Sequence, residues 1–299
     1  MKKYKAMEKI KVNMAVDEDQ SVIEQMQRSY ENCPQAVKYL KKLGVSEEAI
    51  FNNLPKINDF VSDINYCKNC PGVKACQKQR SLLVTTISYF NGYLDRDLSP
   101  CREFLKKTLL GKQFLVRDFP EEWLDYSLDS LYGTMGHLQV MNRYINHLNS
   151  GGSGWIYLNG SGNSGRTFTA AILAVDSAKR KLGPVCFMNC PQRIRELSDL
   201  SYRDQMRFQK ELDRYCNTPV LVLDDFGNEY KNDFIRDAIV FTILSSRSNN
   251  KLITIITSDY SIRDIVALYT NSRNAEIKAQ QLGRILKSSV NKEIDLGGV

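Results

Sequence analysis

The sequence predicts an α/β fold, a parallel sheet covered by helices, preceded by a small helical domain with a cysteine-rich segment. In the C-terminal part, short apolar runs alternate with segments of helical periodicity, as in βαβ units. The N-terminal part has helical periodicity and several cysteines but one strand-like run. This change of pattern predicts an N-terminal domain over 1–105, a linker over 106–123 and an α/β domain over 124–299.

The composition is that of a soluble protein with two domains: 299 residues, of which 42% are hydrophobic and 25% charged. No run approaches the ~18 apolar residues of a membrane span, and the basic start of the chain lacks the apolar stretch of a signal peptide. We therefore expect a cytoplasmic protein with no membrane partner. The net charge of +7 is compatible with a nucleic-acid partner and is equally explained by solubility.

Two or three short helices are predicted at the start of the N-terminal domain. Val22, Ile23 and Met26 recur at helical spacing, and Ser46 is a helix start signal. A strand-like run follows at 81–89.

The C-terminal elements are predicted in a regular order. They are a helix over 124–148, a glycine-rich turn at 151–154, a strand into residue 160, a helix to about 182, a strand at 185–188, a helix over 192–215, a strand at 219–223, a helix over 234–247, a strand at 252–257 and a helix over 274–287. Because strands alternate with helices, we expect a parallel sheet covered on both faces.

The segment that follows the first of these C-terminal strands has the spacing of a phosphate-binding loop, G-x-x-x-x-G-K-[ST]. Its glycines allow a tight turn that directs backbone N–H groups at phosphate oxygens, and the following helix adds the positive end of its dipole. Thr167 offers a hydroxyl to Mg²⁺. The predicted ligands are ATP or ADP with Mg²⁺, and the predicted binding residues are Gly160, Ser161, Gly162, Asn163, Ser164, Gly165, Arg166 and Thr167.

Arg166 stands where this motif has lysine. Arginine carries a larger planar group that cannot occupy the place of a lysine ammonium, so we expect hydrolysis to suffer more than binding. The alternative is a Gly/Ser-rich turn with no ligand.

Two adjacent carboxylates, Asp224 and Asp225, end the apolar run that begins at Pro219. At the carboxyl end of a buried parallel strand, Asp224 would hold Mg²⁺ and Asp225 would orient or polarise the attacking water. Each aspartate alone could be a turn residue or a helix cap. Their place downstream of a phosphate loop favours the metal site.

Four of the eight cysteines predict a structural zinc site; they are Cys67, Cys70, Cys76 and Cys101. The first pair has C-x₂-C spacing, and four protein ligands would leave no position for a catalytic water. Free thiols are the alternative. The two histidines, His137 and His147, are expected in ordinary packing or solvent positions.

As a whole, the chain resembles bacterial replicative helicase loaders of the DnaI/DnaC type, AAA+ proteins that deliver the helicase to DNA. The resemblance covers nearly the whole chain and is closer to the DnaI branch because of the cysteine-bearing N-terminal module. It rests on Tyr157–Gly160, Arg193–Leu197, Leu223–Gly227 with Glu229, Ile253–Ser258 and Gln281–Ile285. In this family a histidine is among the zinc ligands, but this chain has none between residues 1 and 136, so Cys76 takes that place on spacing alone.

The resemblance implies roles for three further residues. Asp259 occupies the place of a polar sensor, usually asparagine, that contacts the terminal phosphate. A carboxylate there repels phosphate unless it is protonated or paired, and Arg166 is a candidate partner. Arg284 would be a sensor that reaches the phosphates, and Arg247 a finger offered to the neighbouring subunit's nucleotide. A surface ion pair is the alternative for both arginines.

The function that the resemblance implies is a division of labour. The N-terminal module would dock on a hexameric DnaB-type helicase, and the AAA+ module would bind ATP and single-stranded DNA and self-associate on the helicase ring. With Arg166 and Asp259 as departures, we expect an ATP-responsive adaptor of replication initiation or restart that hydrolyses ATP weakly. The alternatives are a transposition helper ATPase of similar fold, an initiator that reads duplex sites, and a scaffold that has lost nucleotide.

Overall fold

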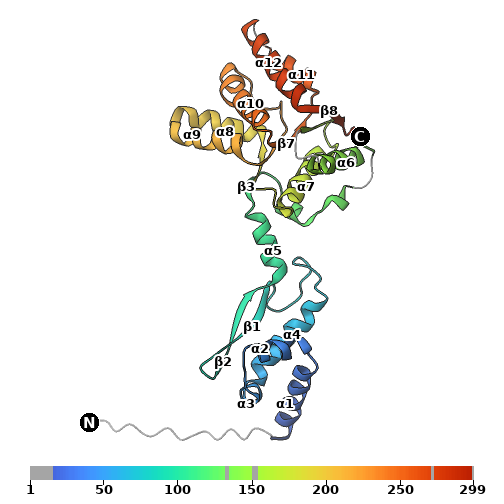
Figure 1. Cartoon of the computed structure of the whole chain (residues 1–299), viewed down its shortest axis with the longest axis vertical. Helices are drawn as coiled ribbons and strands as arrows, with labels where there is room; N and C mark the ends of the chain where they lie inside the picture. Colours follow the sequence, from blue (N-terminus) through green and yellow to red (C-terminus); the bar gives the residue numbers. More distant parts are fainter. Residues whose placement is uncertain (1–15, 132–134, 150–153, 271–272, 298–299) are drawn as a thin grey trace, which may run out of the picture. The chain divides into compact units, whose positions relative to one another are not determined.

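The computed structural model describes residues 16–131, 135–149, 154–270 and 273–297, and the chain forms two compact units, Met1–Lys106 and Lys107–Val299 (Figure 1). Each unit has its own hydrophobic core. The glycine-rich turn predicted at 151–154 lies outside the described residues, apart from Gly154. Within the described ranges, no helix has the length and apolar character needed to cross a membrane.

The first unit combines helices with a two-stranded antiparallel sheet. Its elements are α1 (Val16–Glu31), α2 (Pro34–Lys42), α3 (Glu47–Phe51), α4 (Leu54–Lys68), β1 (Leu83–Phe90), β2 (Tyr93–Pro100) and the start of α5 (Arg102–Gly111). The side chain of Ser46 caps α3 by accepting a hydrogen bond from the Ala49 amide at 3.2 Å. Asn91 and Gly92, both at positive φ, make the two-residue turn between the strands.

The second unit is built on a six-stranded parallel sheet in the order β3-β5-β6-β7-β4-β8. The strands are β3 (Phe114–Arg117), β4 (Trp155–Asn159), β5 (Val185–Asn189), β6 (Val220–Asp224), β7 (Ile253–Ser258) and β8 (Val290–Asp295). The helices and short turns between them are η1 (Glu121–Asp125), η2 (Leu128–Ser130), α6 (Met135–Asn149), α7 (Arg166–Lys179), α8 (Cys190–Arg203), α9 (Gln205–Asn217), the π-helix η3 (Ile235–Val240), α10 (Phe241–Asn249), α11 (Ile262–Leu268) and α12 (Arg273–Ser289).

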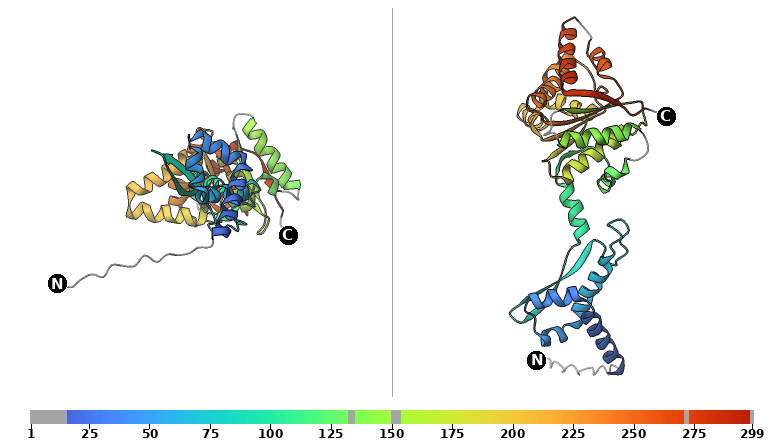
Figure 2. Two further views of the ribbon diagram at one scale, coloured as in Figure 1. Left: turned by 90° about the horizontal axis from the view of Figure 1, so that it is seen from below. Right: turned by 45° about the vertical axis from the view of Figure 1, so that its right-hand side comes forward.

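Both faces of this sheet are covered by helices, and alternate residues of the central strands supply the two cores (Figure 2). On β6, Val220 and Val222 pack with α6 and α7, while Leu221 and Leu223 face the core of α8 to α12. The central strands therefore carry apolar residues on both faces, as expected for a sheet buried on both sides. The α/β class with a covered parallel sheet is as the sequence predicts.

Several boundaries differ from the predictions. Within the predicted linker over 106–123, Phe114–Arg117 forms β3, which pairs with β5 at the edge of the sheet. The helix predicted over 192–215 is broken at Asp204, whose side chain caps α9 by accepting from the Arg207 amide. The helix predicted over 124–148 is divided into η1, η2 and α6, and the one over 234–247 begins as the π-helix η3. Two strands, β2 and β8, were not predicted, because each carries three charged residues.

Candidate nucleotide-binding site

The predicted phosphate loop connects the end of β4 to the start of α7. Gly165 lies at φ 78° as the N-cap of α7, and its carbonyl accepts the first helical hydrogen bond, from the Thr169 amide at 2.8 Å. Gly160 lies at φ 154°, and a Cβ there would come within 2.7 Å of the Gly297 carbonyl oxygen. Only glycine fits at this position. The loop and the helix N-terminus thus have the local geometry that an anion site requires.

Three buried side-chain atoms in the described part of the chain have no hydrogen-bond partner, and all belong to this loop or to the residue before it. They are Asn159 Oδ1, Ser164 Oγ and Arg166 Nε. Buried polar atoms are normally paired, so a cluster of unpaired atoms indicates a missing partner. The hydroxyl of Ser164 and the Nε–H of Arg166 are donors, which suit phosphate oxygens. The loop therefore fits a phosphate-bearing ligand.

Asp224 lies at the end of β6 and is almost fully buried. Its Oδ1 accepts a hydrogen bond from the Thr257 hydroxyl at 2.7 Å. Burial, with a smaller contribution from the charge of Asp225, raises the pKa of Asp224 to about 6, against the hydrogen bonds from Thr257 and Thr167 and the charge of Arg166. Asp224 and Thr167 are thus close neighbours from two elements, an arrangement suited to holding Mg²⁺ between them.

The raised pKa of Asp224 gives a test by pH. A carboxyl whose folded pKa lies above its unfolded value stabilises the fold at low pH, and this stabilisation is lost as pH rises from about 4 to about 6. We therefore expect Asp224→Asn to raise the free energy of unfolding at pH 7 by about 1–3 kcal/mol without nucleotide. Urea unfolding at pH 4 and pH 7 measures this.

The same variant should show no stabilisation by Mg²⁺-ATP, because the carboxylate that holds the metal is gone. Asp213→Asn, an exposed aspartate on α9, is the control and should change neither quantity. If Asp224→Asn were less stable at pH 7 than the unmutated chain, this would contradict the view that burial of the ionised Asp224 carboxylate destabilises the fold.

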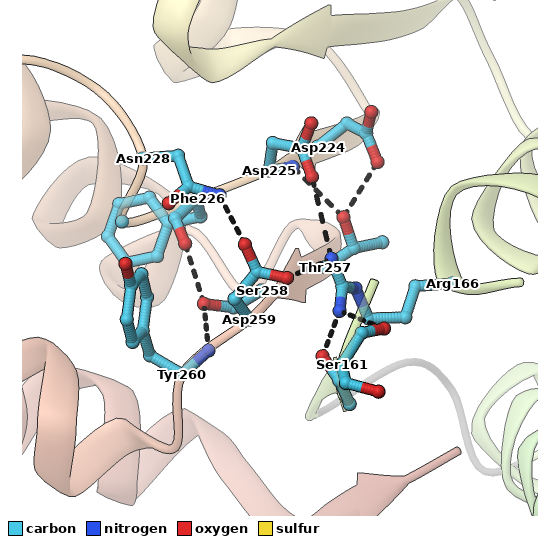
Figure 3. A network of polar contacts seen from close by, with 12 residues as sticks. Ser161, Arg166, Asp224, Asp225, Phe226, Asn228, Thr257, Ser258, Asp259 and Tyr260 are labelled. Atoms are coloured by element: carbon cyan, nitrogen blue, oxygen red, sulfur yellow. Dashed lines mark hydrogen bonds and ion pairs between the residues drawn. The ribbon is translucent and has the colours of Figure 1, made fainter. Parts of the chain in front are cut away.

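Arg166 is buried inside the loop, where its guanidinium is fully engaged except at Nε (Figure 3). Nη1 donates to the carbonyl oxygens of Gly160 and Ser161, the latter at 2.9 Å. Nη2 pairs with Asp259 Oδ1 at 2.5 Å and lies 3.7 Å from Asp225 Oδ1. The pairing of Arg166 with Asp259 that the sequence suggested is therefore present.

Asp259 is held from two sides. Asn228 donates from Nδ2 to the second carboxylate oxygen at 2.6 Å. Burial acts to raise the pKa of Asp259, but the hydrogen bonds from Asn228 and Arg166 and the charge of Arg166 outweigh it and lower this pKa. Asp259 is therefore ionised at neutral pH, and its charge is compensated by Arg166 rather than by a proton.

The end of β7 fixes the Asp-Asp turn of β6 through main-chain and side-chain contacts (Figure 3). The Thr257 hydroxyl accepts from the Asp225 amide at 3.0 Å, and Ser258 Oγ donates to the Phe226 carbonyl at 2.6 Å. Asp225 itself lies at φ 54°, a conformation that aspartate and asparagine tolerate better than most residues. The two carboxylates are thus positioned by residues of the neighbouring strand.

Arg247 does not lie where a finger for a neighbouring subunit must lie. Its side chain has no exposed surface, and its donors bond the carbonyls of Tyr215, Thr218 and Ile253 and the hydroxyl of Thr254. Burial lowers its pKa to about 10, so it remains charged at neutral pH. The finger prediction is corrected: Arg247 is a core residue that joins the end of α9 to the start of β7.

Arg284 is exposed on α12, and the structure describes no ion pair for it. Its sensor role stays a prediction. Glu229 is a further residue of this region, for which the sequence predicts no role. Its buried carboxylate accepts from the Gly227 amide at 2.8 Å and from the Tyr269 hydroxyl. It ties the turn after β6 to α11. Its signal in the sequence was an acidic residue shortly after an apolar strand.

The predicted zinc site is not supported. Among the described residues, no three His, Cys, Asp or Glu side chains are grouped so that they could hold a metal ion. Cys67, Cys70, Cys76 and Cys101 are free thiols. C-x₂-C spacing alone did not bring four ligands together.

Comparisons with known proteins agree with this geometry. The sequence model of the family described as IstB-like ATP binding protein matches residues 152–294, which include the loop and the Asp-Asp turn. The replicative helicase loader DnaI of Bacillus subtilis (strain 168) is 26% identical over 261 residues, covering 81% of this chain and 80% of that protein.

Solved structures show the same fold. A crystal structure of DnaI matches with a TM-score of 0.55 at 25% identity, covering 62% of this chain and 97% of the other. A protein of Streptococcus pyogenes serotype M3, described as a candidate primosome component, matches with a TM-score of 0.52 at 19% identity, covering 65% and 98%. This chain is therefore similar to the replicative helicase loader DnaI, and its covered parallel sheet is consistent with an AAA+ P-loop domain.

Proposed function

We propose that this protein is a helicase loader: it binds a replicative DnaB-type helicase through its N-terminal unit and delivers it to single-stranded DNA. ATP binding to the C-terminal unit sets its state, and hydrolysis is slow. The protein acts in the cytoplasm, during initiation or restart of replication, and self-associates on the helicase ring.

The similarity to DnaI over four-fifths of both chains carries this proposal. A transposition helper ATPase would share the ATP-binding domain, which the IstB-like match covers, but that match begins at residue 152. The similarity to DnaI extends over 261 residues and therefore beyond this domain. This extent favours a loader.

Nucleotide binding is supported by the chemistry of the loop. The unpaired donors of Ser164 and Arg166 and the closeness of Thr167 to Asp224 fit a triphosphate with Mg²⁺. Magnesium, when bound, would neutralise charge between the phosphates, and Asp225 would orient the water that attacks. Arg166 and Asp259 neutralise one another inside this site, which is the physical reason for slow hydrolysis.

The test is co-purification with the replicative helicase of the same cell, with and without ATP. ATP contacts stabilise one assembly state over another, so we expect ATP to increase the helicase retained by about fivefold or more. Thr167→Ala should abolish this increase and leave the retention without ATP unchanged. Thr270→Ala, an exposed threonine on the same unit, is the matched control and should behave as the unmutated chain.

Each part of the proposal can fail separately. No retention of helicase in either condition contradicts the loader. Equal retention with and without ATP contradicts the switch but leaves the loader standing. If ATP also fails to raise the melting temperature, the protein is a scaffold without nucleotide.

A further inference from the structure

The segment after β8 lies directly against the start of the phosphate loop. β8 pairs in parallel with β4 up to Asn159 and Asp295, and the Leu296 amide continues the ladder by donating to the Asn159 carbonyl at 2.9 Å. The next residue, Gly297, places its carbonyl oxygen 2.7 Å from where a Cβ of Gly160 would be. Asp295 Oδ1 accepts from the Gly297 amide at 2.8 Å and fixes this bend. The first glycine of the loop is thus confined by residues far from it in the sequence.

The first turn of α6 also packs against this segment. A Cβ at Gly136 would lie 3.0 Å from Leu296 Cδ2 and 3.3 Å from the Asp295 carbonyl oxygen. At the next residue, His137 Nε2 is 3.9 Å from where a Cβ of Gly165 would be. Gly136 therefore packs on Leu296 next to the start of the loop, and the side chain of the neighbouring His137 lies beside Gly165 at the end of the loop.

We propose that the first turn of α6 and the segment Asp295–Gly297 form a clamp that sets the position of both end glycines of the phosphate loop. This inference rests on the proposed nucleotide binding. The loop binds phosphate by backbone N–H groups, so displacement of its ends by a few tenths of an ångström misdirects these donors. Nucleotide affinity then depends on how closely Gly136 and Leu296 pack, although neither residue is part of the phosphate-binding motif.

The experiment measures Mg²⁺-ADP affinity by titration calorimetry on the full chain. Gly136→Ala introduces a methyl group at 3.0 Å from Leu296 Cδ2 and 3.3 Å from the Asp295 carbonyl oxygen, so these neighbours must give way by a few tenths of an ångström. We expect the affinity to fall about tenfold. Leu296→Ala in the same chain makes room for the methyl group, and the double variant should recover to within about threefold of the unmutated affinity.

Gly111→Ala is the matched control, because the Cβ it adds meets its nearest neighbours at the ordinary distance of 3.9 Å. It should leave ADP affinity unchanged. The melting temperature without nucleotide separates a general loss of stability from a loss of loop position. Recovery of ADP affinity in the double variant would show that the packing of residue 136 against residue 296 controls affinity. A change that only destabilised the fold would not be reversed by Leu296→Ala.

Two outcomes overturn the clamp. One is equal ADP affinity of Gly136→Ala and Gly111→Ala, with the unmutated chain binding ADP normally; nucleotide binding then stands and the clamp fails alone. The other is a double variant that binds more weakly than either single variant. An unmutated chain that binds no ADP overturns both the clamp and the nucleotide part of the proposed function, and helicase retention still tests the loader.

Discussion

Replacing Arg166 by lysine together with Asp259 by asparagine is expected to raise steady-state ATP turnover by about tenfold or more. In the structure Arg166 donates to two carbonyls of the loop and pairs with Asp259 at 2.5 Å. The positive charge of Arg166 therefore interacts with groups of the protein rather than with the phosphates. Lysine would carry a compact charge free to move between phosphates, and asparagine could donate a hydrogen bond where Asp259 repels.

The two single variants should each fall short of the double. Arg166→Lys leaves the Asp259 carboxylate near the terminal phosphate, and Asp259→Asn leaves a buried guanidinium without the closer of its two ion-pair partners. Because the residues are in contact, their effects should be non-additive, with a coupling energy of about 0.5–3 kcal/mol. A double-mutant cycle on turnover and on ATP affinity measures it.

Arg195→Lys, an exposed arginine on α8, is the control for an arginine-to-lysine change. Brisk hydrolysis by the unmutated chain would refute the account of this pair. So would purely additive effects, since these would mean that the two side chains act independently.

Replacing Arg247 by methionine is expected to lower the free energy of unfolding by about 3 kcal/mol or more. Methionine keeps an unbranched apolar side chain but removes the donors to three carbonyls and one hydroxyl, all in the core. Two of these carbonyls lie at the end of α9, where the helix dipole favours a cation. Each acceptor left unpaired and buried adds to the cost.

Urea unfolding of the full chain, followed by circular dichroism, measures this change. Arg263→Met, at an exposed position on α11, is the matched control and should stay within about 0.5 kcal/mol of the unmutated chain. A loss as small as that of the control would show that the carbonyls find other partners. A normal fold with a loss of ATP turnover in mixed subunits would instead revive the finger role.

The fold class could be predicted because the central strands are apolar on both faces. Val220–Leu223 and Ile253–Ile256 carry no charged residue, and only a doubly covered sheet accepts such runs. The edge strand β8 was missed because its residues include Lys292, Glu293 and Asp295. Its pairing with β4 is a tertiary contact between distant segments, which local pattern does not reveal. For the same reason β3 was taken for a linker.

Candidate site residues could be predicted where they belong to a motif of fixed spacing. They could not be predicted where the position of the side chain depends on whether it is buried. The positions of the loop residues and of the Asp-Asp pair could be predicted because they depend on local sequence spacing. Arg247 was misplaced, because an arginine near a helix end has the same sequence signature whether it is exposed or buried. The predicted zinc site is unsupported for a related reason. Two thiols at C-x₂-C spacing define one pair of ligands, but the spacing does not show where the second pair lies.

The tight contact between α11 and α12 has a mechanical consequence. A Cβ at Gly283 would lie 2.4 Å from Val266 Cγ2, so the helices touch too closely to slide past one another. α11 starts just after Asp259, where Ser261 caps it with Asp264. If a bound nucleotide separated Arg166 from Asp259, we would expect α11 and α12 to be displaced together. Arg284, which follows Gly283 on α12 and is exposed, would move with these two helices.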